Sequence, residues 1–469
     1  MRPRRSSRLR QDLRASVIDG TAYMVMLGLA ETYFAVFVLE LKLGEVAAGL
    51  ILTIPLFLAS VMQLGTPWLV RKVGSHRKVS AWTAGFQVVA LLPMIGIALV
   101  GRVPAWVVFL CATMYWAGAV VGGPAWSAWM GRLVPGRVRG SFFALRNRWL
   151  QVGVLSGLLV GGGILRLSNV LDGWLAMPEH AGHAMGGRDW TLPAFAVLFA
   201  LAAVARAVST WYLWKQSEGA LAERTERHVT GMALLSRIGH GNDARLIACL
   251  LGVFFARQLA EPYWHPYVKE QLGNTYDRYV LLLATGFLGK MLALPVLQRV
   301  VRRIGPLRLL RAGAVALVPV SGLWVVSESL AWLVVAQVMA GAALACWELA
   351  SFLMLYEAIA PEERTSVISK HTFVQYLAGT GGSLVGGAAL AALGKDAQAY
   401  VWLFLGTMVV RLGMLALVSR VRMGASVEPI LEGPVAVLNE AGAGAGVPAT
   451  PEQAVTVEAD GSDARMGSR

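Results

Sequence analysis

The chain has 469 residues, of which 56% are hydrophobic and 15% are charged, and its mean hydropathy is +0.57. Soluble globular domains carry about 25% charged residues, so this composition excludes that class. The net charge of +14 would suggest nucleic-acid binding in a soluble protein, but here Arg and Lys gather in alternate loops between apolar segments. We therefore expect a lipid bilayer around the chain and no nucleic acid.

Apolar stretches of some 20 residues, the length that spans a hydrocarbon core of roughly 30 Å, recur along the whole chain. They predict twelve membrane-spanning helices, and hence an all-α membrane protein. The first six helices fall at about 16–41, 46–70, 79–101, 104–131, 143–167 and 191–215. The second six fall at about 246–270, 276–300, 308–327, 331–357, 367–393 and 398–420.

The remaining segments complete the predicted organisation. A basic N-terminus, 1–15, precedes a first six-helix half, 16–215, and a polar cytoplasmic linker, 216–245, leads to a second half, 246–422. The tail, 423–469, lacks apolar periodicity and is predicted to be disordered. Because the basic loops alternate from the N-terminus onward, both termini are predicted to lie in the cytoplasm, with the protein in the plasma (bacterial inner) membrane.

The two halves repeat each other in sequence. Residues 29–33 (LAETY) of the first helix reappear as 259–263 (LAEPY) of the seventh, and 71–74 (RKVG) reappear as 302–305 (RRIG). In the fifth helix, 157–162 (GLLVGG) reappears as 382–387 (GSLVGG) in the eleventh. Three matches in the same order predict two parallel-repeat six-helix bundles, a design in which substrate sites lie between the repeats near the bilayer midplane.

These motifs resemble the major facilitator superfamily of secondary transporters, over roughly 15–422. The loop after the second helix is similar to that family's signature but has Arg71 where the family has Asp, and the second copy has Arg302 there. The loops at 135–140 and 361–364 are also similar to the family's. The resemblance implies cytoplasmic gating loops, whose candidate residues are Arg71, Lys72, Gly74, Arg77, Arg139, Arg302, Arg303, Gly305 and Arg364.

Small residues recur every four positions in the fifth and eleventh helices. They are Gly153, Gly157 and Gly161 in the fifth, and Gly382 and Gly386 in the eleventh. One interpretation is close helix packing, since small residues let helix backbones approach in lipid. The other is the antiporter motif of exporters in the same family, although Leu158 stands where that motif has Pro.

Two glutamates related by the repeat, Glu31 and Glu261, lie inside predicted spans. An ionised side chain at bilayer depth costs about 2.5–3.5 kcal/mol on insertion scales, so it faces protein or a water-filled cavity. The resemblance places both helices around a central cavity, and we expect one or both carboxyls to bind a proton or the substrate. The alternative for Glu261 is a permanent ion pair with Arg257, four residues earlier on the same helix face.

Further candidates surround these carboxyls. On the seventh helix, Gln258 and His265 flank Glu261, and Pro262 and Pro266 predict a break in the helix. The aromatic candidates are Tyr33, Tyr263, Trp116, Trp126 and Trp347, which line a cavity or belong to interfacial belts. Glu348 lies beside Trp347, and Lys290 either attracts an anionic group or snorkels to the interface.

No cofactor and no enzymatic activity are expected, because phosphate-cradling, nucleophile and metal-hydrolase motifs are missing from the sequence. His180 and His183 in the long external loop, 168–190, form an incomplete metal-ligand set. We expect a monomeric secondary transporter of a small solute that works by alternating access, is coupled to protons and favours export. The alternatives are a proton-coupled uptake permease for a metabolite and a non-transporting receptor or scaffold on the same fold.

Overall fold

The computed structural model describes residues 3–175, 190–218, 242–273, 275–358 and 364–421. Twelve helices in this part of the chain are long and apolar enough to cross a membrane, and the same residues contain no strand. The predicted all-α fold with twelve spans is therefore confirmed. The predicted tail and most of the predicted linker and external loop lie outside the described residues.

The first six spans run from α1 to α10. In chain order the elements are α1 (Pro3–Leu29), η1 (Glu31–Tyr33) and α2 (Phe34–Glu40); α3 (Glu45–Leu50), α4 (Ile54–Gln63) and α5 (Thr66–Val73); α6 (His76–Val100); α7 (Ala105–Val120) and α8 (Gly122–Leu133); α9 (Gly136–Leu175); and α10 (Thr191–Lys215).

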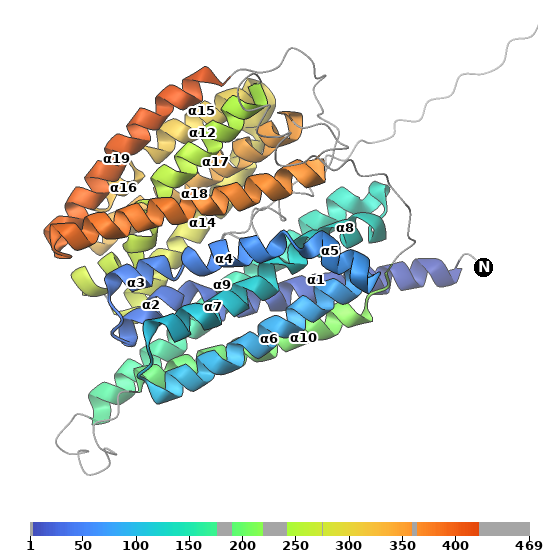
Figure 1. Ribbon diagram of the computed structural model, residues 1–469, viewed down its shortest axis with the longest axis horizontal. Coiled ribbons are helices and arrows are strands. Elements are labelled where there is room, and N and C mark those ends of the chain that lie inside the picture. The colour runs from blue at the N-terminus through green and yellow to red at the C-terminus, as the bar shows by residue number, and fades with distance from the viewer. Residues whose placement is uncertain (1–2, 176–189, 219–241, 274, 359–363, 422–469) are drawn as a thin grey trace, which may run out of the picture.

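The last six spans run from α12 to α19. They are α12 (Asn242–Gln258), η3 (Glu261–Tyr263), α13 (Trp264–Pro266) and η4 (Tyr267–Gln271); α14 (Tyr276–Ile304); α15 (Pro306–Leu317) and α16 (Val320–Leu323); α17 (Leu330–Ala358); α18 (Arg364–Leu393); and α19 (Ala397–Arg420). Figure 1 shows α1–α10 and α12–α19 as two groups lying side by side.

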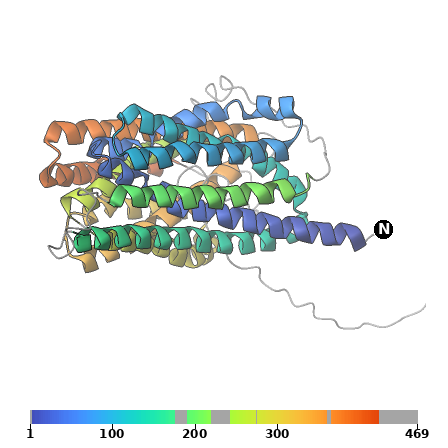
Figure 2. The same cartoon turned by 90° about the horizontal axis from the view of Figure 1, so that it is seen from below.

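Two helices extend beyond their predicted ends. The first helix begins at Pro3, so the basic residues predicted to precede it continue it instead, and Figure 2 shows it running past its neighbours at the N-terminus. Helix α9 continues to Leu175, past the predicted end near residue 167. Apolar content marks only the part of a helix that lies in lipid, whereas Arg, Leu and Gln are good helix formers outside it.

The two halves share a helix break and an equivalent hydrogen bond at the repeated sequence. Both first spans of the two halves are interrupted at the repeated glutamate, by η1 and by η3. The Tyr33 hydroxyl donates a hydrogen bond to the Leu158 carbonyl of α9, and the Tyr263 hydroxyl donates one to the Ser383 carbonyl of α18, each at 2.5 Å. The two halves therefore share a helix break and the tyrosine that ties the break to a neighbouring helix.

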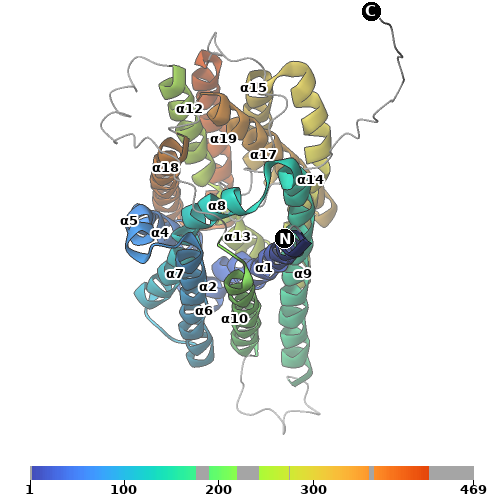
Figure 3. The same ribbon diagram turned by 90° about the vertical axis from the view of Figure 1, so that its right-hand side faces the viewer.

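The halves meet along α9 and α14 and along α3, α4 and α18, as the end-on view in Figure 3 also shows. We call the end where α1 begins the near end. The opposite end, which holds the connections 41–44 and 394–396, is the far end. Polar contacts between the halves gather toward the far end. Tyr276 donates to Glu40 at 2.5 Å and Tyr400 donates to Glu45 at 2.5 Å, and Lys269 and Gln271 join the same two carboxylates.

Candidate functional site

Glu31 lies at the break in the first span. The break is held by the Thr32 hydroxyl, which donates to the Gly28 carbonyl at 2.8 Å, and by the bond from Tyr33 to α9. The Glu31 side chain is buried, with 6% of the residue exposed. Since no proline lies in this stretch, the break could not be predicted from the neighbouring residues.

The surroundings of the Glu31 carboxyl are aromatic and uncharged. The Tyr115 hydroxyl of α7 donates to Glu31 Oε2 at 3.4 Å, and Phe34 packs edge-on against the Tyr115 ring. Tyr23 of α1 and Tyr376 of α18 also lie near Glu31. No cationic side chain in the described part of the chain makes an ion pair with Glu31.

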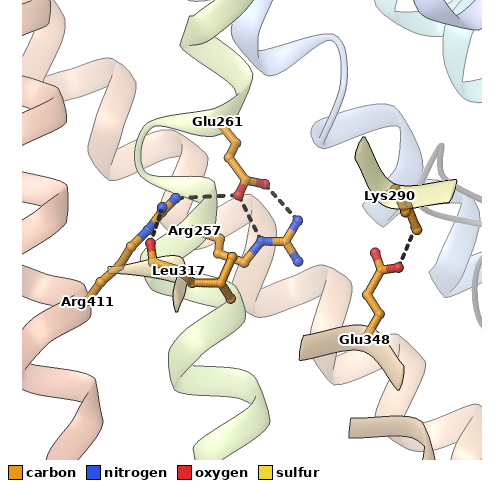
Figure 4. Close-up of polar contacts among 6 residues, drawn as sticks. All are labelled: Arg257, Glu261, Lys290, Leu317, Glu348 and Arg411. Carbon is orange, nitrogen blue, oxygen red and sulfur yellow. Dashed lines mark hydrogen bonds and ion pairs between the residues drawn. The ribbon is translucent and has the colours of Figure 1, made fainter. Parts of the chain in front are cut away.

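Glu261, at the repeated position, is held by two arginines (Figure 4). Arg257 donates to both carboxylate oxygens at 2.8 Å, and Arg411 of α19 reaches Glu261 Oε1 at 3.4 Å. Arg411 also donates to the Leu317 carbonyl of α15 at 2.9 Å. The ion pair with Arg257 that the sequence offered as an alternative is present, and Arg411 adds a partner that the sequence did not predict.

Lys290 and Glu348, which the sequence singled out separately, form an ion pair between α14 and α17 (Figure 4). The Lys290 side chain is 4% exposed and that of Glu348 is 31% exposed. The lysine therefore lies inside the protein and does not reach an interface. Spacing along the chain could not show this pairing, because the two residues are 58 positions apart on different helices.

The other predicted seventh-helix residues lie between helices. The break that Pro262 and Pro266 predict is present, from η3 to η4. His265 Nδ1 is 2.8 Å from the Tyr279 hydroxyl, which donates to the Thr32 carbonyl of the first half at 3.3 Å. His265 thus takes part in a link between the halves, beside the Glu31 break. Gln258 lies against Gly379 and Gly382 of α18.

The tryptophans occupy three different settings. Trp116 is buried, with its ring edge-on to Tyr115 at a centroid distance of 5.7 Å, so it belongs to the surroundings of Glu31. Trp347 is buried, and its backbone lies against Gly313 of α15. Trp126 carries the Arg146 guanidinium over its ring at 4.5 Å, inside the first half.

The signature loops contact only their own half among the described side chains. Arg77 donates to the carbonyls of Trp214 and Gln216 at the end of α10, and Lys72 lies over the exposed Trp68 ring. Gly74 and Gly305 take positive φ, +67° and +79°, where α5 and α14 end. The other five basic candidates have no contact to describe. Arg71 and Arg303 are exposed, and the side chains of Arg139, Arg302 and Arg364 lie outside the described residues.

The glycines of α9 lie against α1, and those of α18 lie against α12. A Cβ at Gly153 or Gly157 would meet the carbonyl of Thr21 or Val25, and one at Gly161 would meet the Tyr33 ring. In the second half, a Cβ at Gly382 or Gly386 would meet the carbonyl of Phe255 or Leu259. In both halves, glycines four residues apart let one helix backbone approach the first span of the same half closely.

The sequence analysis missed a cluster at the near end of the first half. Asp19, Arg206 and Arg146 come from α1, α10 and α9 and line one pocket. The signal available was three charged residues inside predicted spans, Asp19, Arg146 and Arg206, but nothing in their spacing brought them together. No group of three metal-ligating side chains occurs in the described part of the chain, and His180 and His183 lie outside it.

Comparison with known proteins agrees with this architecture. The sequence model of the Major Facilitator Superfamily matches residues 246–447. A mutant of the nucleoside transporter NupG has a TM-score of 0.66 at 13% identity, covering 87% of this chain and 99% of that one. No curated protein sequence gives a significant match.

Two other solved structures share the fold. An inward-facing, unoccupied bacterial homologue of the human lysosomal transporter Spinster has a TM-score of 0.61 at 14% identity, covering 92% of this chain and all of that one. The Major Facilitator Superfamily transporter FucP, in an outward conformation, has a TM-score of 0.56 at 12% identity, covering 87% and 98%. The resemblance predicted from the sequence is confirmed: this is a multi-pass membrane protein with the major facilitator fold.

Proposed function

We propose that the protein is a secondary transporter of a small solute that works by alternating access, with Glu31 as its proton-binding residue. The fold supports transport, because similar proteins with this architecture are transporters. The observation that carries the coupling is the contrast between two carboxyls at equivalent positions. Glu261 contacts two arginines, whereas Glu31 accepts one hydrogen bond among the described residues, from Tyr115.

Glu31 is suited to binding and releasing a proton. Transferring an unpaired carboxylate out of water is very costly, so a buried carboxyl without a cation is stable only while it is protonated or reached by water or a cation. Glu31 lies between the halves, where α1 meets α7 and close to α18 and Tyr279. A change in how the halves meet would change its access to water, and that change would load or release the proton.

Glu261 has a different role in this proposal. Two hydrogen bonds from Arg257 and one from Arg411 keep it charged and tie α12 to α19 and, through Leu317, to α15. Glu261 therefore holds the helices of the second half together, so that this half moves as a rigid unit relative to the first. Glu40 and Glu45 accept hydrogen bonds from the second half at the far end. In this conformation these contacts close the far end of the solute's route between the two halves.

The direction of transport has no structural support in the fifth-helix glycines, because the eleventh helix makes the same contacts. Close packing explains both sets, so we propose no direction from them.

Proton coupling is testable in liposomes that contain the purified protein and a pH-sensitive dye. Nucleosides are the first solutes to add, given the fold shared with a nucleoside transporter, followed by other metabolites and by amphiphiles. A solute that is transported should move protons with it, and Glu31→Gln should abolish the proton signal. The control is Glu328→Gln, an exposed carboxyl at the far end. Solute-driven proton movement that survives Glu31→Gln would refute the role of Glu31, and no transport of any solute would favour the scaffold alternative.

A further inference from the structure

A pocket lies inside the first half, away from the interface between the halves. Its empty volume is about 690 Å³ including its open mouth, and every lining residue belongs to α1, α6, α7, α8, α9 or α10. Glu31 is not among the lining residues, and Tyr23, which lies between Glu31 and Arg206, is the residue that the pocket shares with the surroundings of the proposed proton site.

The charged lining carries an excess of positive charge. Arg146 and Arg206 face the pocket together with one acidic residue, Asp19. Ser209 bridges two of these groups: it accepts a hydrogen bond from Arg206 Nη1 at 2.7 Å and donates one to Asp19 Oδ1 at 2.6 Å. Both guanidiniums also lie over aromatic rings that line the pocket, Arg206 over Tyr23 and Arg146 over Trp126.

Arg206 has a donor with no acceptor. The residue is 7% exposed, and its Nε atom is buried without a hydrogen-bond partner among the residues that the structure describes. Leaving a buried donor unsatisfied is destabilising, and more so for a charged group. A ligand with a negatively charged oxygen at this wall would satisfy the donor and balance the charge, because carboxylates match the planar guanidinium.

The rest of the lining fits an apolar body attached to that anionic group. Met24, Ala119, Leu150 and Leu213 supply apolar walls, and Gly123 keeps part of one wall free of side chains. At Gly123 an added Cβ would meet no atom within 4 Å, so this wall borders open space. The hydroxyls of Ser80, Thr83 and Ser127 are the remaining polar groups.

We propose that this pocket binds a small organic anion, a monocarboxylate with an apolar body, whose carboxylate is held by Arg206. Asp19 competes with the ligand for the same positive charge through Ser209. The site lies within one six-helix half, and its occupation needs no movement of one half against the other. The proposal therefore stands or falls by binding, whether or not the protein transports a solute.

The test uses the full chain, purified in detergent, and isothermal titration calorimetry at constant ionic strength. The probes are acetate, butyrate and benzoate, with benzamide as the neutral counterpart of benzoate. We expect saturable binding of benzoate or butyrate and none of benzamide. Since hydrogen bonds to charged groups contribute about 1.5–3 kcal/mol, Arg206→Gln should weaken binding by about tenfold or more. Asp19→Asn should tighten it, because the competing charge is gone.

Controls separate binding from folding. Arg311→Gln changes an arginine in α15 of the other half, outside the Glu261 site, and should leave carboxylate binding unchanged. If Arg206→Gln does not fold, the double variant Asp19→Asn with Arg206→Gln removes both charges and should fold but not bind. The proposal is overturned if no carboxylate binds, if benzamide binds as well as benzoate, or if Asp19→Asn weakens binding or Arg206→Gln leaves it unchanged.

Discussion

Replacing Glu261 by Gln is expected to destabilise the protein strongly, because it leaves two buried arginines without a counter-charge. The Arg257 side chain is 10% exposed and that of Arg411 is 3% exposed, while Glu261 is the carboxylate that both contact. Removing one partner of a buried ion pair costs about 3–5 kcal/mol. We therefore expect Glu261→Gln to lose about that much unfolding free energy.

The same change at Glu31 is expected to cost little. Among the described residues, the Glu31 carboxylate accepts one hydrogen bond, a long one of 3.4 Å from Tyr115, and the Gln oxygen can still accept it. A neutral amide also removes the charge that has no partner at this position. The expected change in unfolding free energy is within about 1 kcal/mol, in either direction.

Thermal unfolding of both variants in the same detergent measures the contrast, with pH held constant. The double variant Arg257→Gln with Glu261→Gln removes both members of the closest pair and should recover part of the loss. Equal melting temperatures for Glu31→Gln and Glu261→Gln would refute the reasoning, because they would mean that the two arginines do not depend on Glu261.

Three further predictions follow from single contacts. Glu348→Gln should destabilise more than Lys290→Gln in thermal unfolding, since it leaves the 4% exposed lysine unpaired whereas the reverse change leaves a carboxylate that is 31% exposed. Gly157→Leu should prevent folding or lower the melting temperature, because a Cβ there meets the α1 backbone, while Gly163→Leu, with nothing within 4 Å, should not; equal effects would contradict the packing role. The double variant Glu40→Gln with Glu45→Gln should open the far end, because it removes the charges that both contacts there depend on. Spin labels at Arg102 and Glu328, which are exposed on opposite halves, should then lie farther apart. An unchanged distance would show that the two carboxylates do not close the far end.

The fold was predictable because bilayer thickness and the sequence repeat act over long stretches. A stretch of twenty apolar residues predicts a membrane-spanning helix wherever it occurs in the chain. The similarity of 29–33 to 259–263 predicts that the two halves have related structures. Helix ends were less predictable, as α1 shows, because a helix continues into water when its polar residues favour helix.

The candidate site was predictable only in part. Proline marked the break at Glu261, but nothing local marked the equivalent break at Glu31, which is fixed by bonds to α9. Each charged residue has a partner on a helix that is distant in the sequence. Glu261 pairs with Arg411, Lys290 pairs with Glu348, and Asp19 accepts a hydrogen bond from Ser209. A single sequence shows which residues are charged within the membrane but not which of them meet.

The measurement that tests the central claim most directly is the pH dependence of far-end opening in lipid. Spin labels at Arg102 and Glu328 would report the distance between the halves at acidic and neutral pH, with no need to know the solute. If Glu31 is the proton-binding residue that drives alternating access, the two distance populations should shift with pH in the otherwise unmodified chain and stay fixed in Glu31→Gln. A pH-dependent shift of the same size in Glu31→Gln would contradict the account.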